Sequence, residues 1–524
     1  MKQIAIYDST LRDGAQAQGI SYSVEDKLKI VERLDALGVR YIEAGNPGSN
    51  PKDLEFFERV RGMRLRHAKL IAFGATRKVG VRAEDDNNLR SILAAGTDAV
   101  AIFGKSWDYQ VTEILRTRLD ENLGMIGDTI RYLKQQGKEV VYDAEHFYDG
   151  YKANPDYALA TLQAAAEAGA DCLCLCDTNG GSFPEAIFAA TQAVAARFTT
   201  PIGIHCHNDC EMAVANSVMA VRAGATQVQG TINGIGERCG NANLCSIIPN
   251  LQLKLGLACI PPENMATLAT VARAVADIAN LPHNEKAPYV GADAFAHKGG
   301  MHIDAVVKNP VSYEHIDPEL VGNSRRTLMS EVAGRSTLLA RIQAIDPAIG
   351  KDAPETKRII DRLKKLEHEG YHFEAAEQSF ALVVRKMLGK HTPFFELIEF
   401  KVMVNEPSVN NVNSSAIVKI RVGDDIEITA AEGDGPVNAL DNAARKALER
   451  FYPAIGAIRL TDYKVRVLDS KEASAAKVRV LIESTDHSEN WTTIGVSTNI
   501  IDASWHALVD SIEYKLVRDQ ERRA

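Results

Sequence analysis

The feature that most constrains the fold is an alternation of short apolar runs and amphipathic helical segments along the first half of the chain. Segments such as 24–38 and 157–170 carry apolar residues at i, i+3 and i+4 and a Gly near the end. Parallel strands need a crossover helix, and eight strand–helix units in about 250 residues are typical of a closed (β/α)8 TIM barrel. We predict this α/β barrel over residues 1–280. The eight runs, rich in Val and Ile, are 4–8, 41–45, 70–75, 99–104, 140–147, 172–178, 202–209 and 228–234.

The rest of the chain divides into two further regions. After the barrel, a stretch rich in Gly, Pro and His is followed by helical patterns. Two strand patterns (394–404 and 416–430) then precede a helical one (438–451), and strand patterns followed by a helix recur about sixty residues later. We predict a connecting region with helical subdomains over 281–390 and a C-terminal α+β domain of two repeated units over 391–520, with an effector site between the copies.

The charge balance excludes two classes of partner. The 524 residues include 60 Lys and Arg against 69 Asp and Glu, a formal net charge of −9, so there is no basic excess to bind nucleic acid or a membrane surface. No stretch of 18 uncharged apolar residues occurs, and the first residues lack the basic and apolar segments of a signal peptide. We therefore expect a cytoplasmic protein.

Cysteine spacing indicates packing. No CxxC pair or zinc-ribbon spacing is present, and three cysteines alternate along the predicted strand 172–178. We expect buried, reduced thiols at all eight positions: Cys172, Cys174, Cys176, Cys206, Cys210, Cys239, Cys245 and Cys259.

The seventh predicted strand carries the most informative residues. His205 and His207 are two positions apart, so both imidazoles point to the same side of the strand. They could form a hydrogen-bonded core pair, but burying both without partners is costly, which favours metal ligation. The neighbouring strand ends offer oxygen ligands, and imidazole with oxygen suits a catalytic Mn, Zn, Co or Mg ion without selecting one. The polar residues at these strand ends are Asp8, Arg12 and Asp13 after the first strand, and Glu237, Arg238, Asn241 and Asn243 after the eighth, and the carboxylates and amides among them supply the oxygen atoms.

Polar residues also end other strands, and the catalytic face of a TIM barrel lies at these ends. Any one of them could be a helix cap, but together they predict an active site. Gly234, Gly236 and Gly240 form either a tight loop or a phosphate contact. Phe73 and Phe103 either narrow the pocket or pack in the core. The further polar residues are Glu43, Asn46, Asp143, Glu145, His146, Asp177 and Thr178.

Three segments, 8–16 (DSTLRDGAQ), 205–209 (HCHND) and 234–244 (GIGERCGNANL), resemble the acyl-CoA-condensing barrel enzymes that include 2-isopropylmalate, homocitrate and citramalate synthases. The resemblance covers essentially the whole chain. Residues 433–443 (GDGPVNALDNA) resemble a regulatory domain that binds a branched-chain amino acid. Segments around residues 42–57, 143–159 and 297–323 most resemble the branch of the family that makes (R)-citramalate.

The resemblance implies a role for particular residues. Asp13, His205, His207 and Asn241 would bind the divalent metal. Arg12 would stabilise the alkoxide, while Glu145 and Thr178, with Glu43, would bind the 2-oxo acid. His302, Asp304 and Tyr313 match residues that help to deprotonate the acetyl-CoA methyl group and assist thioester hydrolysis.

The implied reaction joins acetyl-CoA, as co-substrate, to pyruvate and releases CoA by hydrolysis, as the first step of a pyruvate route to isoleucine. Isoleucine would be the feedback inhibitor, and the family is expected to form homodimers. The residues leave three alternatives: a 2-isopropylmalate synthase using 2-oxoisovalerate, an amino-acid sensor with an inactive barrel, and a lyase running the reverse cleavage.

Overall fold

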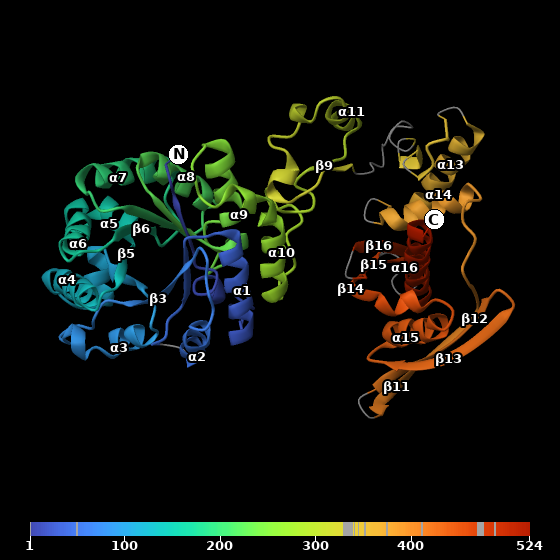
Figure 1. The fold of residues 1–524 in the computed structure, drawn as a ribbon, viewed down its shortest axis with the longest axis horizontal. Coiled ribbons are helices and arrows are strands. Elements are labelled where there is room, and N and C mark those ends of the chain that lie inside the picture. The colour runs from blue at the N-terminus through green and yellow to red at the C-terminus, as the bar shows by residue number, and fades with distance from the viewer. Residues whose placement is uncertain are drawn as a thin grey trace. The chain divides into compact units, whose positions relative to one another are not determined.

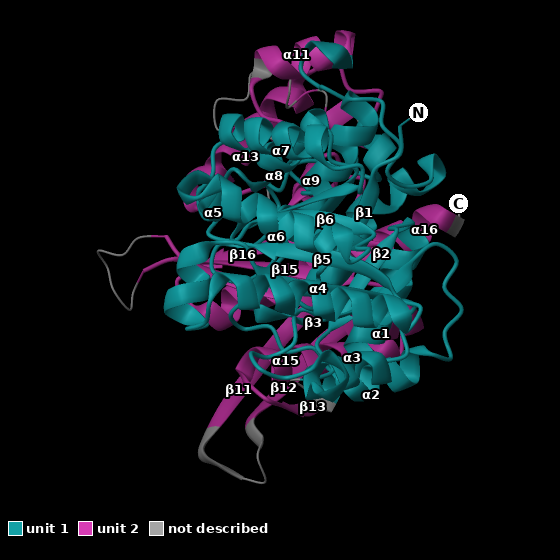
Figure 2. Cartoon of the chain, turned by 90° about the vertical axis from the view of Figure 1, so that its left-hand side faces the viewer, with its two compact units in different colours: residues 1–296, 310–326 teal, residues 297–309, 327–524 magenta. Residues whose placement is uncertain are grey.

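The computed structural model describes residues 2–48, 51–327, 339, 341–343, 345–350, 353–373, 376–409, 412–468, 476–486 and 489–523. The chain forms two compact units. The first consists of residues 1–296 and 310–326, and the second of residues 297–309 and 327–524 (Figure 2, teal and magenta).

The first unit is a closed barrel of eight parallel strands, which confirms the predicted fold class (Figure 1). Each strand pairs with the next, and β1 closes the ring against β8, with Asp8 opposite Gly230. The strands are β1 (Ala5–Asp8), β2 (Tyr41–Gly45), β3 (Lys69–Ala75), β4 (Ala99–Lys105), β5 (Glu139–Glu145), β6 (Cys172–Asp177), β7 (Ile202–Cys206) and β8 (Gln227–Gly230).

Helices surround the barrel and cover the outer face of its strands (Figure 1). Helix α1 shows how the sequence sets their ends. Ser23 Oγ accepts the Asp26 N–H (3.1 Å), an Asp26 carboxylate oxygen accepts the Ser23 N–H (2.9 Å), and Gly38 ends the helix at φ 94°. The helices are α1 (Val24–Leu37), α2 (Pro51–Val60), α3 (Asn87–Ala94), α4 (Leu119–Gln135), α5 (Phe147–Ala153), α6 (Pro155–Glu167), α7 (Pro184–Arg197), α8 (Ala213–Ala223), α9 (Leu244–Pro249) and α10 (Leu268–Ile278).

Side chains alternate between two cores along each strand. In β1, Ile6 packs outward beneath the helices, whereas Tyr7 belongs to the cluster inside the barrel. Cys172, Cys174 and Cys176 belong to that inner cluster, as their spacing predicts. The prediction of buried thiols is wrong for Cys210 and Cys239, which are exposed because they lie in loops that follow β7 and β8 rather than in strands.

The second unit contains two antiparallel sheets of three strands, each followed by a helix. This confirms the predicted repeat of strands and helix. Residues 416–430 do not form one strand, because the chain turns at Gly423 (φ 59°) and continues as a hairpin. The elements of this unit are α11 (Gly300–Lys308), α13 (Pro354–Glu369), α14 (Glu377–Met387), β11 (Glu396–Val409), β12 (Val412–Val422), β13 (Asp425–Gly433), α15 (Pro436–Glu449), β14 (Arg459–Val467), β15 (Val478–Thr485), β16 (Asn490–Ser497) and α16 (Ile500–Arg523). Two short strands, β9 (Ala296–His297) and β10 (Arg326–Thr327), pair with each other.

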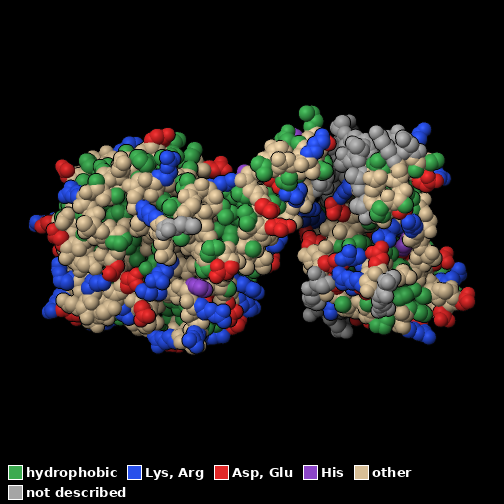
Figure 3. Space-filling view, turned by 45° about the horizontal axis from the view of Figure 1, so that its top comes forward, with side chains coloured by type: hydrophobic (Ala, Val, Ile, Leu, Met, Phe, Trp, Pro, Cys, Tyr) green, Lys and Arg blue, Asp and Glu red, His purple; other side chains and the backbone are tan. Residues whose placement is uncertain are grey.

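The surface matches the near balance of charge in the sequence. Acidic and basic side chains are interspersed on the face drawn in Figure 3. Among the helices that the structure describes, none is both long and apolar enough to cross a bilayer.

A buried acid in the second unit predicts a pH-dependent stability. Glu513 on α16 lies with its Oε2 2.5 Å from Nε2 of His391, and its Oε1 accepts the Phe394 N–H. Burial raises the pKa of Glu513 to about 7 and lowers the pKa of His391, which also lies near Lys386 and Arg385. Between pH 4.5 and 7 the folded carboxyl therefore binds more protons than the unfolded one, so its contribution to stability falls as pH rises.

We expect the difference in unfolding free energy between proteins without and with Glu513→Gln to fall by about 3 kcal/mol from pH 4.5 to pH 7.5. Because His391 lies 2.5 Å from this carboxyl, both proteins also carry His391→Gln, so that only the carboxyl differs between them. The measurement is urea unfolding followed by tryptophan fluorescence across this pH range. A difference that stays constant with pH contradicts the prediction.

Candidate metal centre and active site

The carboxyl ends of the barrel strands surround one cavity of about 220 Å³. It is formed by residues from the loop after β1, from β3 to β7, and from the loops after β6, β7 and β8. Polar groups from strands far apart in sequence therefore meet at one place, as the predicted active site requires. The lining residues are Arg12, Asp13, Gln16, Phe73, Phe103, Asp143, Glu145, Cys176, Thr178, His205, His207, Glu237 and Arg238.

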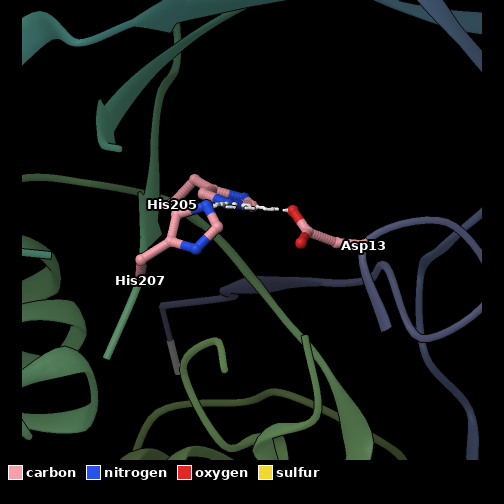
Figure 4. Close-up of side chains that lie close together, drawn as sticks. All are labelled: Asp13, His205 and His207. Atoms are coloured by element: carbon pink, nitrogen blue, oxygen red, sulfur yellow. Dashed lines mark hydrogen bonds and ion pairs between the residues drawn. The ribbon is translucent and has the colours of Figure 1, made fainter. Parts of the chain in front are cut away.

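Two imidazoles and one carboxylate converge in this cavity (Figure 4). Nε2 of His205 lies 3.5 Å, and Nε2 of His207 4.0 Å, from the same oxygen of Asp13, and the two Nε2 atoms are 3.4 Å apart. Two donors that each lie about 2.1 Å from one ion are separated by roughly 3.0–3.4 Å. The two imidazoles match this spacing, whereas the Asp13 oxygen lies slightly farther out, so the three side chains form a candidate site for one divalent ion.

Asn241 supplies the fourth candidate ligand. Its backbone pairs with that of His207, and its side chain is buried. Neither its amide oxygen nor its amide nitrogen has a hydrogen-bond partner among the described residues, and the same holds for Oδ1 of Asp13. Buried polar atoms are normally satisfied, so these orphaned atoms fit a ligand that the polypeptide does not provide.

The glycines of the 234–240 loop make room for this side chain. A Cβ on Gly236 would lie 2.1 Å from the Asn241 amide nitrogen, and one on Gly240 would lie 2.0 Å from the Gly234 carbonyl oxygen. Gly234 and Gly240 also have positive φ values, 68° and 90°. The tight-loop interpretation of these glycines therefore agrees with the structure.

Arg12 is fixed by two carboxylates beside the metal pocket. Its Nε donates to Oε2 of Glu43 (2.7 Å), its Nη1 donates to Oδ2 of Asp13 (2.9 Å), and its guanidinium lies 4.0 Å above the ring of Phe73. Glu43 does not line the cavity. It is fully buried and also accepts hydrogen bonds from Tyr7 and Ser9, so in this structure it orients Arg12.

The electrostatics favour an ionised Asp13 and a neutral His207. Burial alone would raise the pKa of Asp13, but Arg12 and His205 lower it well below its usual range. For His205, the Asp13 carboxylate outweighs burial and raises the pKa. Burial and the charge of His205 lower the pKa of His207 to about 3, which leaves its imidazole available as a metal ligand.

Two further lining residues, Glu145 at the end of β5 and Thr178 directly after β6, make polar contacts. Oε2 of Glu145 lies 2.5 Å from Nζ of Lys105, and Oγ1 of Thr178 accepts the His146 N–H (2.8 Å). The rings of Phe73 and Phe103 stack with centroids 5.2 Å apart. Both rings line the cavity, so they limit its width instead of packing only in the core.

Several candidate residues lie outside this cavity. His302 and Asp304 are on α11 in the second unit, where Asp304 pairs with Lys308, and Tyr313 follows a 3₁₀ turn in the first unit. Other polar strand ends bond to neighbouring groups within the loops: Asp8 with Thr10, Asn46 with Gly48, His146 with Asp149, Asp177 with Ser182, and Asn243 with Cys245.

Sequence reasoning missed four residues at or beside the site. Gln16 and Cys176 line the cavity, Lys105 pairs with Glu145, and Gln229 bonds to His205. The sequence does contain a signal for Gln229: it is a polar side chain in the middle of a short buried strand, and such a side chain needs a polar partner inside the barrel.

A second group of potential ligand atoms lies beside the first. The carboxylate of Asp143 and the thiols of Cys174 and Cys176 lie within 4.8 Å of one another. Burial raises the pKa of Cys174 well above its usual value, so it remains a thiol, and an Asp143 oxygen already accepts a hydrogen bond from Gln229. This group is therefore best described as part of the barrel interior.

Family models match nearly the whole chain. The HMGL-like model matches residues 3–275, the homocitrate synthase post-HMGL domain-like model matches residues 289–371, and the LeuA allosteric (dimerisation) domain model matches residues 374–516. Together with the barrel and its metal pocket, these matches define a metal-dependent barrel enzyme of the HMGL-like class.

Full-length relatives narrow this class. The chain is 52% identical over 522 residues to the (R)-citramalate synthase of Aquifex aeolicus and 51% identical to that of Geobacter sulfurreducens, with 99% of both chains covered in each comparison. It is 30% identical to the 2-isopropylmalate synthase of Methanocaldococcus jannaschii, over 99% of this chain and 96% of that one. The chain belongs to the (R)-citramalate synthase family.

Proposed function

We propose that this chain condenses acetyl-CoA with pyruvate and hydrolyses the thioester, giving (R)-citramalate and CoA. The observation that carries the proposal is the convergence of Asp13, His205, His207 and Arg12 in one cavity, in a chain whose full-length relatives are named (R)-citramalate synthase. The candidate metal ligands are all present in this chain, which argues against the alternative of an amino-acid sensor with an inactive barrel.

Asp13, His205, His207 and Asn241 would hold the divalent ion, whose chemistry is to polarise the keto group of the oxo acid as a Lewis acid. We infer that Arg12 donates to the keto oxygen as it gains negative charge, because its guanidinium is held in the same cavity.

Other residues would position the substrates and move protons. Glu145 and Thr178, which line the same cavity, would bind the oxo acid. We propose that His302, Asp304 and Tyr313 help to remove a proton from the acetyl-CoA methyl group and assist attack of water on the thioester. The methyl carbon then forms a bond to the keto carbon, and water releases CoA.

We further propose the domain functions. Residues 1–280 would form the catalytic barrel, residues 281–390 a connecting region, and residues 391–520 a regulatory and dimerising domain. The match of residues 374–516 to an allosteric (dimerisation) domain supports a regulated homodimer. We propose isoleucine as its inhibitor and the cytoplasm as its location.

Thiol release from acetyl-CoA tests the proposed function. We expect the purified, metal-loaded protein to prefer pyruvate over 2-oxobutyrate, 2-oxoisovalerate and 2-oxoglutarate by at least about tenfold in kcat/KM, because each extra methylene in a fitted pocket costs about 1–3 kcal/mol. EDTA should abolish release, and isoleucine should reduce it more than leucine does.

Each other outcome contradicts a part of the proposal. Preference for 2-oxoisovalerate would move the chain to 2-isopropylmalate synthesis, and activity that resists EDTA would exclude the metal. No release with any oxo acid would exclude a synthase and leave the sensor or the lyase.

A further inference from the structure

A chain of hydrogen bonds runs from the interior of the barrel to one metal-site histidine. Nδ1 of His205 lies 2.9 Å from Oε1 of Gln229 on β8, and Nε2 of Gln229 donates to Oδ1 of Asp143 on β5 (2.9 Å). All three side chains are almost fully buried. The chain therefore links strands β5, β8 and β7 across the inside of the barrel.

The direction of the Gln229 amide follows from its neighbours. The amide nitrogen faces two acceptors, the Asp143 carboxylate and, at 3.4 Å, the side-chain oxygen of Gln227. Burial raises the pKa of Asp143 to about 6, so the carboxyl is ionised at pH 8 and can only accept. If the amide were flipped, its oxygen would face both of these acceptors and neither could receive a hydrogen bond. The amide oxygen must therefore face His205.

This orientation determines where His205 carries its proton. An amide oxygen can only accept, so Nδ1 of His205 must be the protonated nitrogen. In the neutral imidazole, which is the form that binds a metal, Nε2 then presents a lone pair toward Asp13 and His207, where the candidate ion would lie. His207 has no such support, since its Nδ1 lacks a hydrogen-bond partner within the described part of the chain.

We propose that Gln229 is a positioning residue that fixes the tautomer and ring orientation of His205 for metal binding, and that Asp143 orients Gln229. This inference rests on the proposed function only in assuming that the Asp13–His205–His207 pocket binds a divalent ion. Outer-shell partners of this kind hold a ligand ring in place and increase its basicity.

Co²⁺ binding to the full-length, metal-free protein at pH 8 tests the proposal without using activity. We expect Gln229→Met, which keeps the volume but removes the acceptor, to weaken Co²⁺ affinity about 10–100-fold. The visible spectrum of bound Co²⁺ should change as well, because it reports the ligand set. Gln163→Met is the control with the same substitution, because Gln163 lies on α6 and donates to Glu167 there, and its affinity should stay close to that of wild type.

A double variant that exchanges the acid of Asp143 and the amide of Gln229 tests whether the hydrogen bonds, and not packing alone, account for the loss of affinity. In Asp143→Asn/Gln229→Glu, the new amide can donate to the new carboxylate, which can still accept from His205, and the net charge is unchanged. We expect this double variant to recover the affinity that Gln229→Met loses. Thermal unfolding of the metal-free proteins shows whether Gln229→Met folds. If it does not fold, the double variant, which restores the polar pairs, still tests the proposal through its Co²⁺ affinity.

The outcomes separate the two claims. Folded Gln229→Met with wild-type Co²⁺ affinity, or a folded double variant that fails to recover affinity, would overturn the positioning role while leaving the metal centre intact. Wild-type protein that binds no Co²⁺ would overturn the metal centre, and with it both this inference and the proposed function.

Discussion

Asp13→Asn is expected to abolish metal binding and activity together. Asp13 is the only carboxylate in the candidate ligand set, and one of its oxygens faces both Nε2 atoms of His205 and His207. The amide keeps the shape of the side chain but removes the negative charge that offsets a divalent ion. The loss of Co²⁺ affinity should therefore exceed the roughly 10–100-fold loss typical of an outer-shell change.

Calorimetric titration with Co²⁺ and thiol release with pyruvate measure the two effects. Asp149→Asn is a suitable control, because Asp149 lies on α5, where it pairs with His146 and Asn179 and contacts none of the candidate ligands. An Asp13→Asn protein that binds Co²⁺ like wild type would contradict the assigned ligand set. An Asp13→Asn protein that binds Co²⁺ normally but has lost activity would show that Asp13 has a catalytic role other than metal binding.

The barrel was predictable because its strands are buried on both faces and separated by regular helices. Segments such as 99–104 and 172–176 are continuous apolar runs, and the intervening helices carry clear caps and apolar periodicity. The hairpin within 416–430 was missed for a local reason. Its turn at Gly423 and Asp424 interrupts an otherwise alternating sequence by only two residues, so the two strands read as one pattern.

The candidate site was predictable where a residue lies at a strand end and its type is unusual there. His205 and His207 satisfied this condition, whereas Asp13 and Asn241 lie in the loops after β1 and β8 and were singled out as ligands by the family resemblance. Glu43 satisfied it too, yet the structure places it beneath Arg12, because strand position predicts the barrel end but not the depth of a side chain.

Contacts inside the barrel were not predictable, because they join strands that are distant in sequence. Asp143 and Gln229 are 86 positions apart, and their contact depends on the closed ring of strands and on its register. Lys105 and Glu145 face each other because β4 and β5 pair directly. The roles of residues on α11 came only from the family resemblance.

Arg12→Lys is expected to lower kcat with pyruvate by ~10²–10³-fold, which is the cost of losing one donor to a developing oxyanion. The guanidinium is fixed at Nε by Glu43 and at Nη1 by Asp13, over the ring of Phe73. A single ammonium group cannot make both bonds in that geometry while facing the keto oxygen. Steady-state kinetics of thiol release gives kcat and KM separately.

Co²⁺ affinity distinguishes this effect from damage to the metal centre, because the positive charge beside Asp13 is kept and any loss of affinity should be smaller than the loss in kcat. Arg238→Lys is the matched control: Arg238 also lines the cavity, but its guanidinium is bound to Asp209 and the Thr178 carbonyl at the rim. We expect its kcat to change much less. If Arg12→Lys retained the wild-type kcat, the alkoxide would have to be stabilised by other groups, and the metal centre alone would then account for the polarisation of the keto group.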